Sequence, residues 1–135
     1  MSRSGYSEDC EYLDLYRHSV ERAISGQRGQ KFLRDFISAL DALPSKRLID
    51  GELECGGDVC SLGSVGKLRG IDMARLDVDD HDSISKTFGI ARVMAAEIMF
   101  ENDEGVAYFN RETPEQRWVR MRQWAASNLK DHLTD

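Results

Sequence analysis

The segment that most constrains the fold is Glu52–Gly70, because the spacing of its apolar residues changes halfway along it. Between positions 52 and 55, glutamates alternate with Leu53 and Cys55, as in a half-buried strand. Gly56-Gly57-Asp58 then supplies a tight turn, since glycine tolerates positive φ. From position 59 or 60 the apolar spacing becomes helical. The segment therefore predicts a short β-hairpin that leads into a small helix.

This small helix is rich in small residues, namely Cys60, Gly63, Ser64 and Gly66. Each glycine weakens an isolated helix by about 1 kcal/mol, but small side chains let another backbone come close. The helix must therefore be stabilised by neighbours. We expect it to pack under the first and last helices of the chain.

Two helices are expected before this segment. Apolar residues recur every three or four positions from Tyr12 to Ile24, and again from Phe32 to Leu43, just before Pro44. The short connection between the two predicts antiparallel neighbours. The sequence Lys46–Gly51 is expected to begin the strand that continues into the hairpin.

Two further helices are expected at residues 83–88 and 91–100, joined by a turn at 89–90, with Asp82 or Ser83 as the N-terminal cap of the first. This arrangement is similar to a DNA-binding helix-turn-helix, but the polar positions of the second helix are mostly acidic. A recognition helix that faces phosphates needs the opposite charge. We therefore interpret the pair as packing helices.

The clearest helix start is Thr113-Pro114-Glu115-Gln116, with Thr113 as N-cap and Gln116 three residues later. The C-terminal helix that follows carries Trp118 and Trp124 along or beside an apolar stripe. We interpret the stripe as core. If the tryptophans are instead exposed beside arginines, they predict self-association through this helix.

Together these patterns predict a mainly helical α+β fold with five or six helices and one short β-hairpin. The length of 135 residues fits one domain, expected at 8–133 after a flexible segment 1–7. No apolar stretch approaches the ~20 residues of a membrane span, and the first residues lack the apolar region of a signal peptide. The sequence therefore predicts a cytoplasmic protein.

The net charge of −6 is concentrated in one segment. Residues 71–105 hold 3 basic and 9 acidic residues, whereas 1–70 and 106–135 are close to neutral. An acidic surface repels phosphates, which disfavours direct nucleic-acid binding, and attracts a basic protein. The residues expected to contact such a partner are Asp77, Asp79, Asp80, Asp82, Glu97, Glu101, Asp103 and Glu104.

The sequence indicates no metal ion and no cofactor. The aspartates near His81 lack the glycine and the closing glutamate of a calcium loop, and residues 63–68 lack the spacing of a phosphate-binding loop. Three cysteines without a Cys-x-x-Cys pair do not predict a zinc site. A bridge between Cys55 and Cys60 is geometrically conceivable across the turn and would require an oxidising compartment.

A small enzyme or ligand-binding domain remains an alternative. Its pocket would lie between the hairpin and the helices and would be lined by Cys60, His81, Asn102 and Asp103. Nothing in the spacing of these residues requires them to meet, and no catalytic residue is assigned.

The motif Cys60-Ser61-Leu62-Gly63, the pair Asn102-Asp103 and the start Thr113-Pro114-Glu115 together resemble a family of small uncharacterised phage, prophage and bacterial proteins. The likeness covers roughly residues 15–130. It implies a structural role for Cys60, Leu62, Gly63, Asn102 and Asp103, and no catalytic residue.

The resemblance also implies a function by analogy. Small acidic phage proteins often bind and block a host protein, including nucleases and CRISPR complexes. We therefore expect a non-catalytic accessory protein that binds a basic host protein and inhibits a host defence system.

Overall fold

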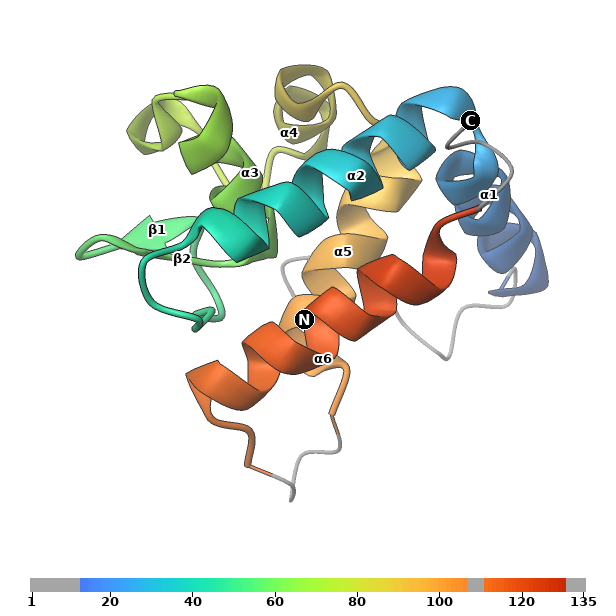
Figure 1. Cartoon of the computed structure of the whole chain (residues 1–135). Coiled ribbons are helices and arrows are strands. Elements are labelled where there is room, and N and C mark those ends of the chain that lie inside the picture. Colours follow the sequence, from blue (N-terminus) through green and yellow to red (C-terminus); the bar gives the residue numbers. More distant parts are fainter. Residues whose placement is uncertain (1–12, 107–110, 131–135) are drawn as a thin grey trace.

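The computed structural model describes residues 13–106 and 111–130, and these form a mainly helical α+β fold, as predicted (Figure 1). The predicted N-terminal segment 1–7 and Cys10 lie outside the described residues. The elements in chain order are α1 (Leu13–Ser25), α2 (Gln27–Ala42), β1 (Glu54–Cys55), β2 (Asp58–Val59), α3 (Ser61–Arg69), the 3₁₀ turn η1 (Met73–Arg75), α4 (His81–Phe88), α5 (Arg92–Glu104) and α6 (Pro114–Asn128).

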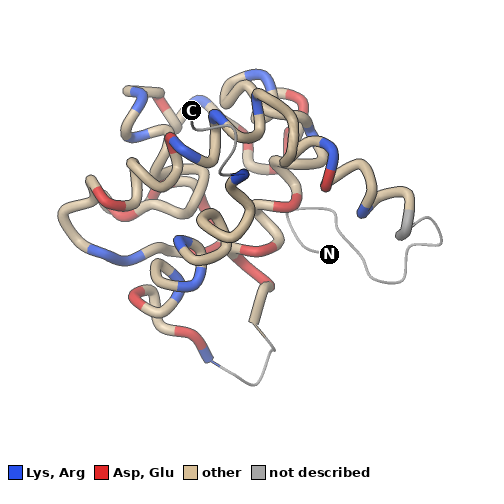
Figure 2. The backbone as a smooth tube through the Cα atoms, turned by 45° about the vertical axis from the view of Figure 1, so that its right-hand side comes forward, with Lys and Arg blue, Asp and Glu red and all other residues tan. Residues whose placement is uncertain are grey.

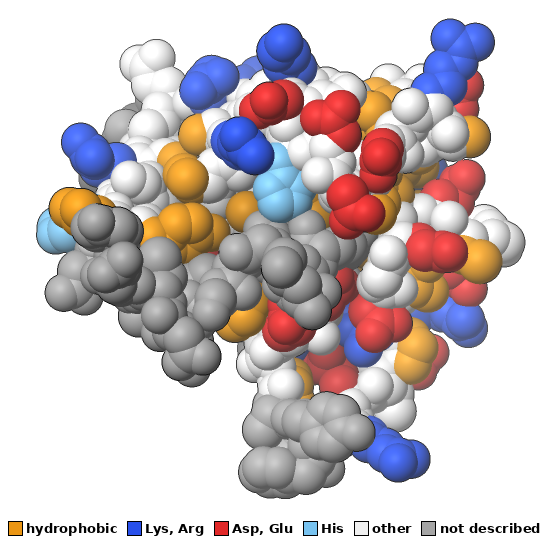
Figure 3. Space-filling model, turned by 180° about the vertical axis from the view of Figure 1, so that it is seen from behind, with side chains coloured by type: hydrophobic (Ala, Val, Ile, Leu, Met, Phe, Trp, Pro, Cys, Tyr) orange, Lys and Arg blue, Asp and Glu red, His pale blue; other side chains and the backbone are white. Residues whose placement is uncertain are grey.

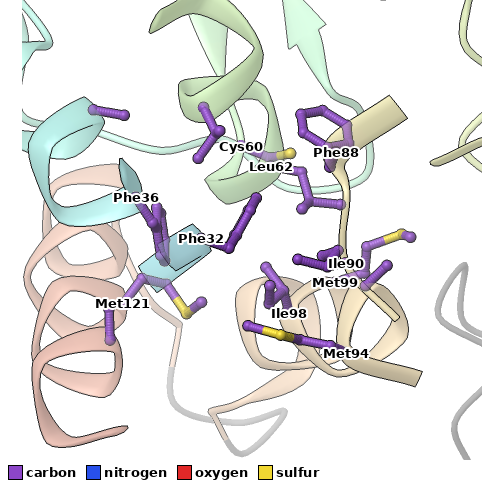
Figure 4. Close-up of a cluster of buried hydrophobic side chains, with 14 of the residues drawn as sticks. Phe32, Phe36, Cys60, Leu62, Phe88, Ile90, Met94, Ile98, Met99 and Met121 are labelled. Carbon is purple, nitrogen blue, oxygen red and sulfur yellow. The ribbon is translucent and has the colours of Figure 1, made fainter. Parts of the chain in front are cut away.

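The hydrophobic core is built mainly on α2 and α5. Phe32 of α2 packs edge-on against Phe88 at the end of α4, with ring centroids 6.4 Å apart. Side chains from α2, α3, α5 and α6 converge there (Figure 4). Each of these side chains buries apolar area that the unfolded chain exposes, and together they hold the helices around one interior. No helix among the described residues is long and apolar enough to cross a membrane.

The small-residue helix α3 packs against α2 and α5. The prediction that it lies under the first and last helices is therefore wrong. Its small residues do permit a close approach: a Cβ built on Gly63 would lie 2.0 Å from the carbonyl oxygen of Leu53. Cys60 caps the helix, since its sulfur accepts a hydrogen bond from the Gly63 N–H at 3.4 Å. The small residues therefore allow α3 to sit directly against the chain that precedes the hairpin.

The hairpin is shorter than predicted. β1 and β2 pair antiparallel, with Glu54 opposite Val59 and Cys55 opposite Asp58. Residues 46–51 do not form a strand. They are held instead by two separate backbone bonds, from Leu48 N–H to the Pro114 carbonyl at 3.0 Å and from Ile49 N–H to the Val59 carbonyl at 2.9 Å. The extended segment is shared between α6 and the hairpin, so it pairs fully with neither.

The start of α6 confirms the predicted cap. The Thr113 hydroxyl accepts a hydrogen bond from the Gln116 N–H at 3.1 Å, and the Gln116 side chain accepts one from the Thr113 N–H at 2.9 Å. Two backbone donors that the helix leaves unpaired are thereby satisfied.

Helix α4 begins two residues earlier than the sequence suggested, at His81. Its N-cap is Asp80, whose carboxylate accepts a hydrogen bond from the Ser83 N–H at 3.2 Å. The prediction of Asp82 or Ser83 as the cap is therefore wrong, because both lie in the first turn. Asp80 and Asp82 both place negative charge at the positive end of the helix dipole.

Candidate functional site

A hollow of about 400 Å³ lies between the hairpin and the segment that links α3 to α4. Its charged rim is formed by Glu52, Glu54 and Asp77. The remaining lining residues are all apolar: Leu53, Met73, Ala74, Leu76 and Val78. We call this site the acidic hollow. Its volume lies in the usual range for binding pockets.

The acidic hollow is continuous in sequence with the aspartates just before and at the start of α4. Asp77, Asp79, Asp80 and Asp82 are all exposed. The Asp77 carboxylate accepts a hydrogen bond from the Asp79 N–H at 2.9 Å, which fixes the turn. Asp82 has a weak surface contact with Arg92 at 3.3 Å. On the face shown in Figure 3, acidic side chains lie beside exposed hydrophobic ones.

The hollow combines an apolar lining with carboxylates. Leu53 and Met73 are buried, while Leu76 and Val78 are half-buried, so the hollow has an apolar floor that remains partly open to solvent. The carboxylates around it can attract a cation from a distance, and the floor can then bury an apolar side chain. The arrangement suits a basic protein segment that carries a hydrophobic residue.

The predicted binding residues on α5 do not join this surface as a group. Glu97 is only 2% exposed and forms an ion pair with Arg17 of α1 at 2.7 Å. The prediction that it faces a partner is therefore wrong. It was placed on a polar stripe, but the middle of α5 is buried on nearly every side, so Glu97 lies in the interior.

The remaining acidic residues of α5 lie near its end. Glu104 is exposed, whereas Glu101 and Asp103 are half-buried. Glu101 lies 3.9 Å from Arg120, which in turn pairs with Glu112 at 2.6 Å. Arg117 also approaches Glu112 at 3.3 Å and donates to the Leu48 carbonyl at 2.8 Å. These charges therefore neutralise one another between α5 and α6.

Burial and the negative charge of Glu97 raise the pKa of Glu101, although Arg120 and Arg17 oppose the shift. The folded state then binds a proton more readily than the unfolded state, so stability rises as pH falls through this raised pKa toward the ordinary glutamate range. We expect Glu101→Gln to stabilise the protein at pH 7 by less than about 1 kcal/mol. Urea unfolding at pH 7 and pH 4 would show the gain only at pH 7. A gain of equal size at both pH values would contradict this assignment.

Asn102 forms a buried junction between three parts of the chain. Its side-chain oxygen accepts hydrogen bonds from the Ser61 N–H at 3.0 Å and the Ser61 hydroxyl at 2.6 Å. Its amide nitrogen donates to the Ile49 carbonyl at 3.0 Å and to Asp103 at 2.9 Å. Asp103 also accepts a bond from the Gly51 N–H at 3.2 Å. The Asn-Asp pair thus joins the end of α5 to the start of α3 and to the segment before the hairpin.

Asn102 and Asp103 of this junction were also expected to line a ligand pocket together with Cys60 and His81. Cys60 and Asn102 are buried, at 0% and 1% exposure, and both side chains hydrogen bond to neighbouring backbone. His81 is the first residue of α4. Asn102 bonds to Ser61, the residue that follows Cys60, and Asp103 accepts a bond from the Gly51 N–H, so both side chains hold backbone.

Both described cysteines are free thiols. Cys55 is exposed on β1, and a hydrogen bond to Glu52, together with the charge of that carboxylate, raises the pKa of its thiol. A thiol with a raised pKa stays protonated at neutral pH and is a poor nucleophile. Within residues 13–106 and 111–130, no three His, Cys, Asp or Glu side chains are grouped closely enough to hold a metal ion.

The tryptophans of α6 are both half-buried. Trp118 donates a hydrogen bond from its indole nitrogen to the Leu40 carbonyl at 3.1 Å, and the Lys46 ammonium lies 5.8 Å from its ring. Met121 and Ala125 of the same predicted stripe are fully buried. The stripe therefore belongs largely to the core, and self-association through Trp118 and Trp124 stays a prediction.

Sequence reasoning missed Glu52 and Glu54 as site residues. They were interpreted only as the exposed side of a hairpin strand. The alternation of glutamate with Leu53 was the available signal, since it placed the two carboxylates together on one face of the strand and Leu53 on the other. What the sequence did not reveal is that residues 73–78 pack opposite them.

Charged residues of both signs are distributed over most elements of the fold (Figure 2). Many are engaged in ion pairs. Arg47 pairs with Asp58 at 2.8 Å, and Arg122 holds Asp41 through two bonds, which lowers the pKa of that carboxyl. The carboxylates of the acidic hollow therefore stand out by their position around an apolar floor rather than by number alone.

Comparisons of the chain with protein-family models, with curated proteins and with solved structures found no match.

Proposed function

We propose that this protein is a non-catalytic binding module whose acidic hollow receives a basic and apolar segment of a partner protein. One observation carries the proposal: Glu52, Glu54 and Asp77 surround a floor that includes the half-buried Leu76 and Val78. Negative charge alone would attract many basic proteins, each of them weakly. A carboxylate rim with an apolar floor favours a segment that presents both a cation and a hydrophobic side chain.

The mechanism of binding follows from the two parts of the hollow. The carboxylates speed the encounter with a basic surface, and this contribution weakens with added salt. The apolar floor then slows dissociation, because separation re-exposes apolar area to water. The resemblance extends the proposal to an accessory protein of phage or prophage origin. Such a protein binds over the functional surface of a host defence protein and blocks it sterically.

The first test is affinity capture of host proteins, followed by kinetic measurements with the purified partner. We expect Glu52→Lys with Asp77→Lys to slow association by about tenfold, because attraction at the rim becomes repulsion. The control is Glu21→Lys with Glu104→Lys, which makes the same change in net charge at two exposed positions outside the hollow. Equal effects of the two double variants would contradict a role for the hollow.

A second variant separates the floor from the rim. Val78→Ser keeps the charge and removes apolar surface from the half-buried part of the hollow. We expect faster dissociation by several-fold with a nearly unchanged association rate. A change in association rate alone would argue against burial of an apolar side chain at this site.

A further inference from the structure

We propose that a second hollow, between α2 and the ends of α3 and α4, binds the phosphate group of a small ligand. Its volume is about 200 Å³. Four cations line it, namely Arg28, Lys31, Arg69 and Lys86. The other lining residues are Phe32, Thr87, Phe88 and Gly89. We call it the basic hollow. The ends of α3 and α4 meet where Arg69 bonds to the Phe88 carbonyl, and Phe88 packs against Phe32 of α2; Figure 1 shows the three helices.

Arg69 is the fixed member of the group. Its guanidinium donates to the Phe88 carbonyl at 2.9 Å and to the Asp35 carboxylate at 2.8 Å, and it lies 5.5 Å from the centre of the Phe32 ring. These contacts hold the charge in one place at the C-terminal ends of α3 and α4. A positioned guanidinium loses little conformational freedom when an anion binds beside it.

Two of these cations lie near the start of α2. Arg28 and Lys31 lie in the first two turns of the helix, at the positive end of its dipole, and no acidic residue lies in its first turn. Cations are disfavoured at this position. Within the described part of the chain, the ion pair of Lys31 is a long contact with Asp35, at 3.6 Å on an exposed surface. A bound anion would remove the mutual repulsion of these charges.

The size and charge of the basic hollow indicate which kind of ligand fits it. No carboxylate lines it, although Asp35 neutralises part of the charge of Arg69. Its volume is below that of most small-molecule pockets and suits one compact anionic group. A long phosphodiester is disfavoured, because α4 carries Asp80 and Asp82 at its other end. A phosphate group, free or as a monoester, therefore fits best.

The test is a titration of ¹⁵N-labelled protein with inorganic phosphate and with phenyl phosphate at constant ionic strength. We expect saturable amide shifts at residues 28–32 and 86–89. Lys31→Gln with Lys86→Gln should weaken binding by about tenfold or more, since charge-assisted contacts are lost. Arg111→Gln removes one exposed cation outside the hollow and should leave binding unchanged. Saturation by phosphate would identify the free anion as sufficient, whereas saturation by the ester alone would identify a monoester.

Three results would overturn the proposal. The first is the absence of saturable shifts with either probe. The second is equal binding by the Lys31→Gln/Lys86→Gln variant and the Arg111→Gln control. The third is stronger binding of a single-stranded oligonucleotide than of phenyl phosphate, which would assign the site to a nucleic acid. These outcomes do not depend on the acidic hollow, because the two hollows share no residue.

Discussion

Gly63→Ala is expected to lower the free energy of unfolding by about 3 kcal/mol or more. The added Cβ would lie 2.0 Å from the Leu53 carbonyl oxygen and 3.0 Å from the Val59 Cβ. The Leu53 oxygen is a backbone atom that already accepts a hydrogen bond from the Cys60 N–H at 3.1 Å, so it cannot move aside without breaking that bond. Urea unfolding monitored by circular dichroism measures the loss.

The control is Gly66→Ala in the same helix. Alanine gains about 1 kcal/mol of helix propensity at either position. At Gly66 the new Cβ would meet the Met73 sulfur at 2.6 Å, and this flexible side chain can shift. We expect Gly66→Ala to stay within about 1 kcal/mol of the unaltered protein. Equal destabilisation by the two substitutions would show that α3 does not dock directly against the segment before the hairpin.

Asn102→Ala should destabilise the fold by about 3 to 5 kcal/mol, because it leaves the buried Ser61 N–H and the Ile49 carbonyl without their partner. The matched control is Asn128→Ala, which removes one side-chain bond to the Trp124 carbonyl at the end of α6. That loss should cost about 1 kcal/mol. Comparable losses for the two variants would contradict the junction.

Asn102→Asp provides a sharper version of the same experiment. The carboxylate keeps the acceptor for Ser61 but loses the donor to Ile49, and it places a second negative charge beside Asp103. Protonation restores a donor and removes the repulsion. The variant should therefore regain stability as pH falls, whereas Asn102→Ala should not. If the free energy of unfolding changes with pH in the same way for both variants, repulsion from Asp103 does not contribute to the destabilisation by Asn102→Asp.

The local features of the fold could be predicted from the sequence because they depend on neighbouring residues. The cap at Thr113 and Gln116 is set by side chains three positions apart, and the hairpin turn by adjacent glycines. Small residues in α3 correctly indicated a close approach. They did not identify which helices approach, because that depends on residues distant in the chain.

The candidate site was predicted in part, for the same reason. Asp77, Asp79 and Asp80 are exposed because they lie in a loop that ends at the helix cap, and Asp82 is exposed on the first turn of α4. Glu97 was misplaced, since a polar residue on a helix buried on nearly every side looks the same in sequence as one that faces water. Its ion pair with Arg17 joins residues 80 positions apart, a contact that spacing within one helix cannot reveal.

The most direct test of the central claim is to titrate ¹⁵N-labelled protein with the captured partner and to map the residues whose amide signals change. The account predicts changes at residues 52–54 and 73–78, with weaker binding at higher salt. Changes centred instead on Trp118 and Trp124, with residues 52–54 and 73–78 unaffected, would contradict it.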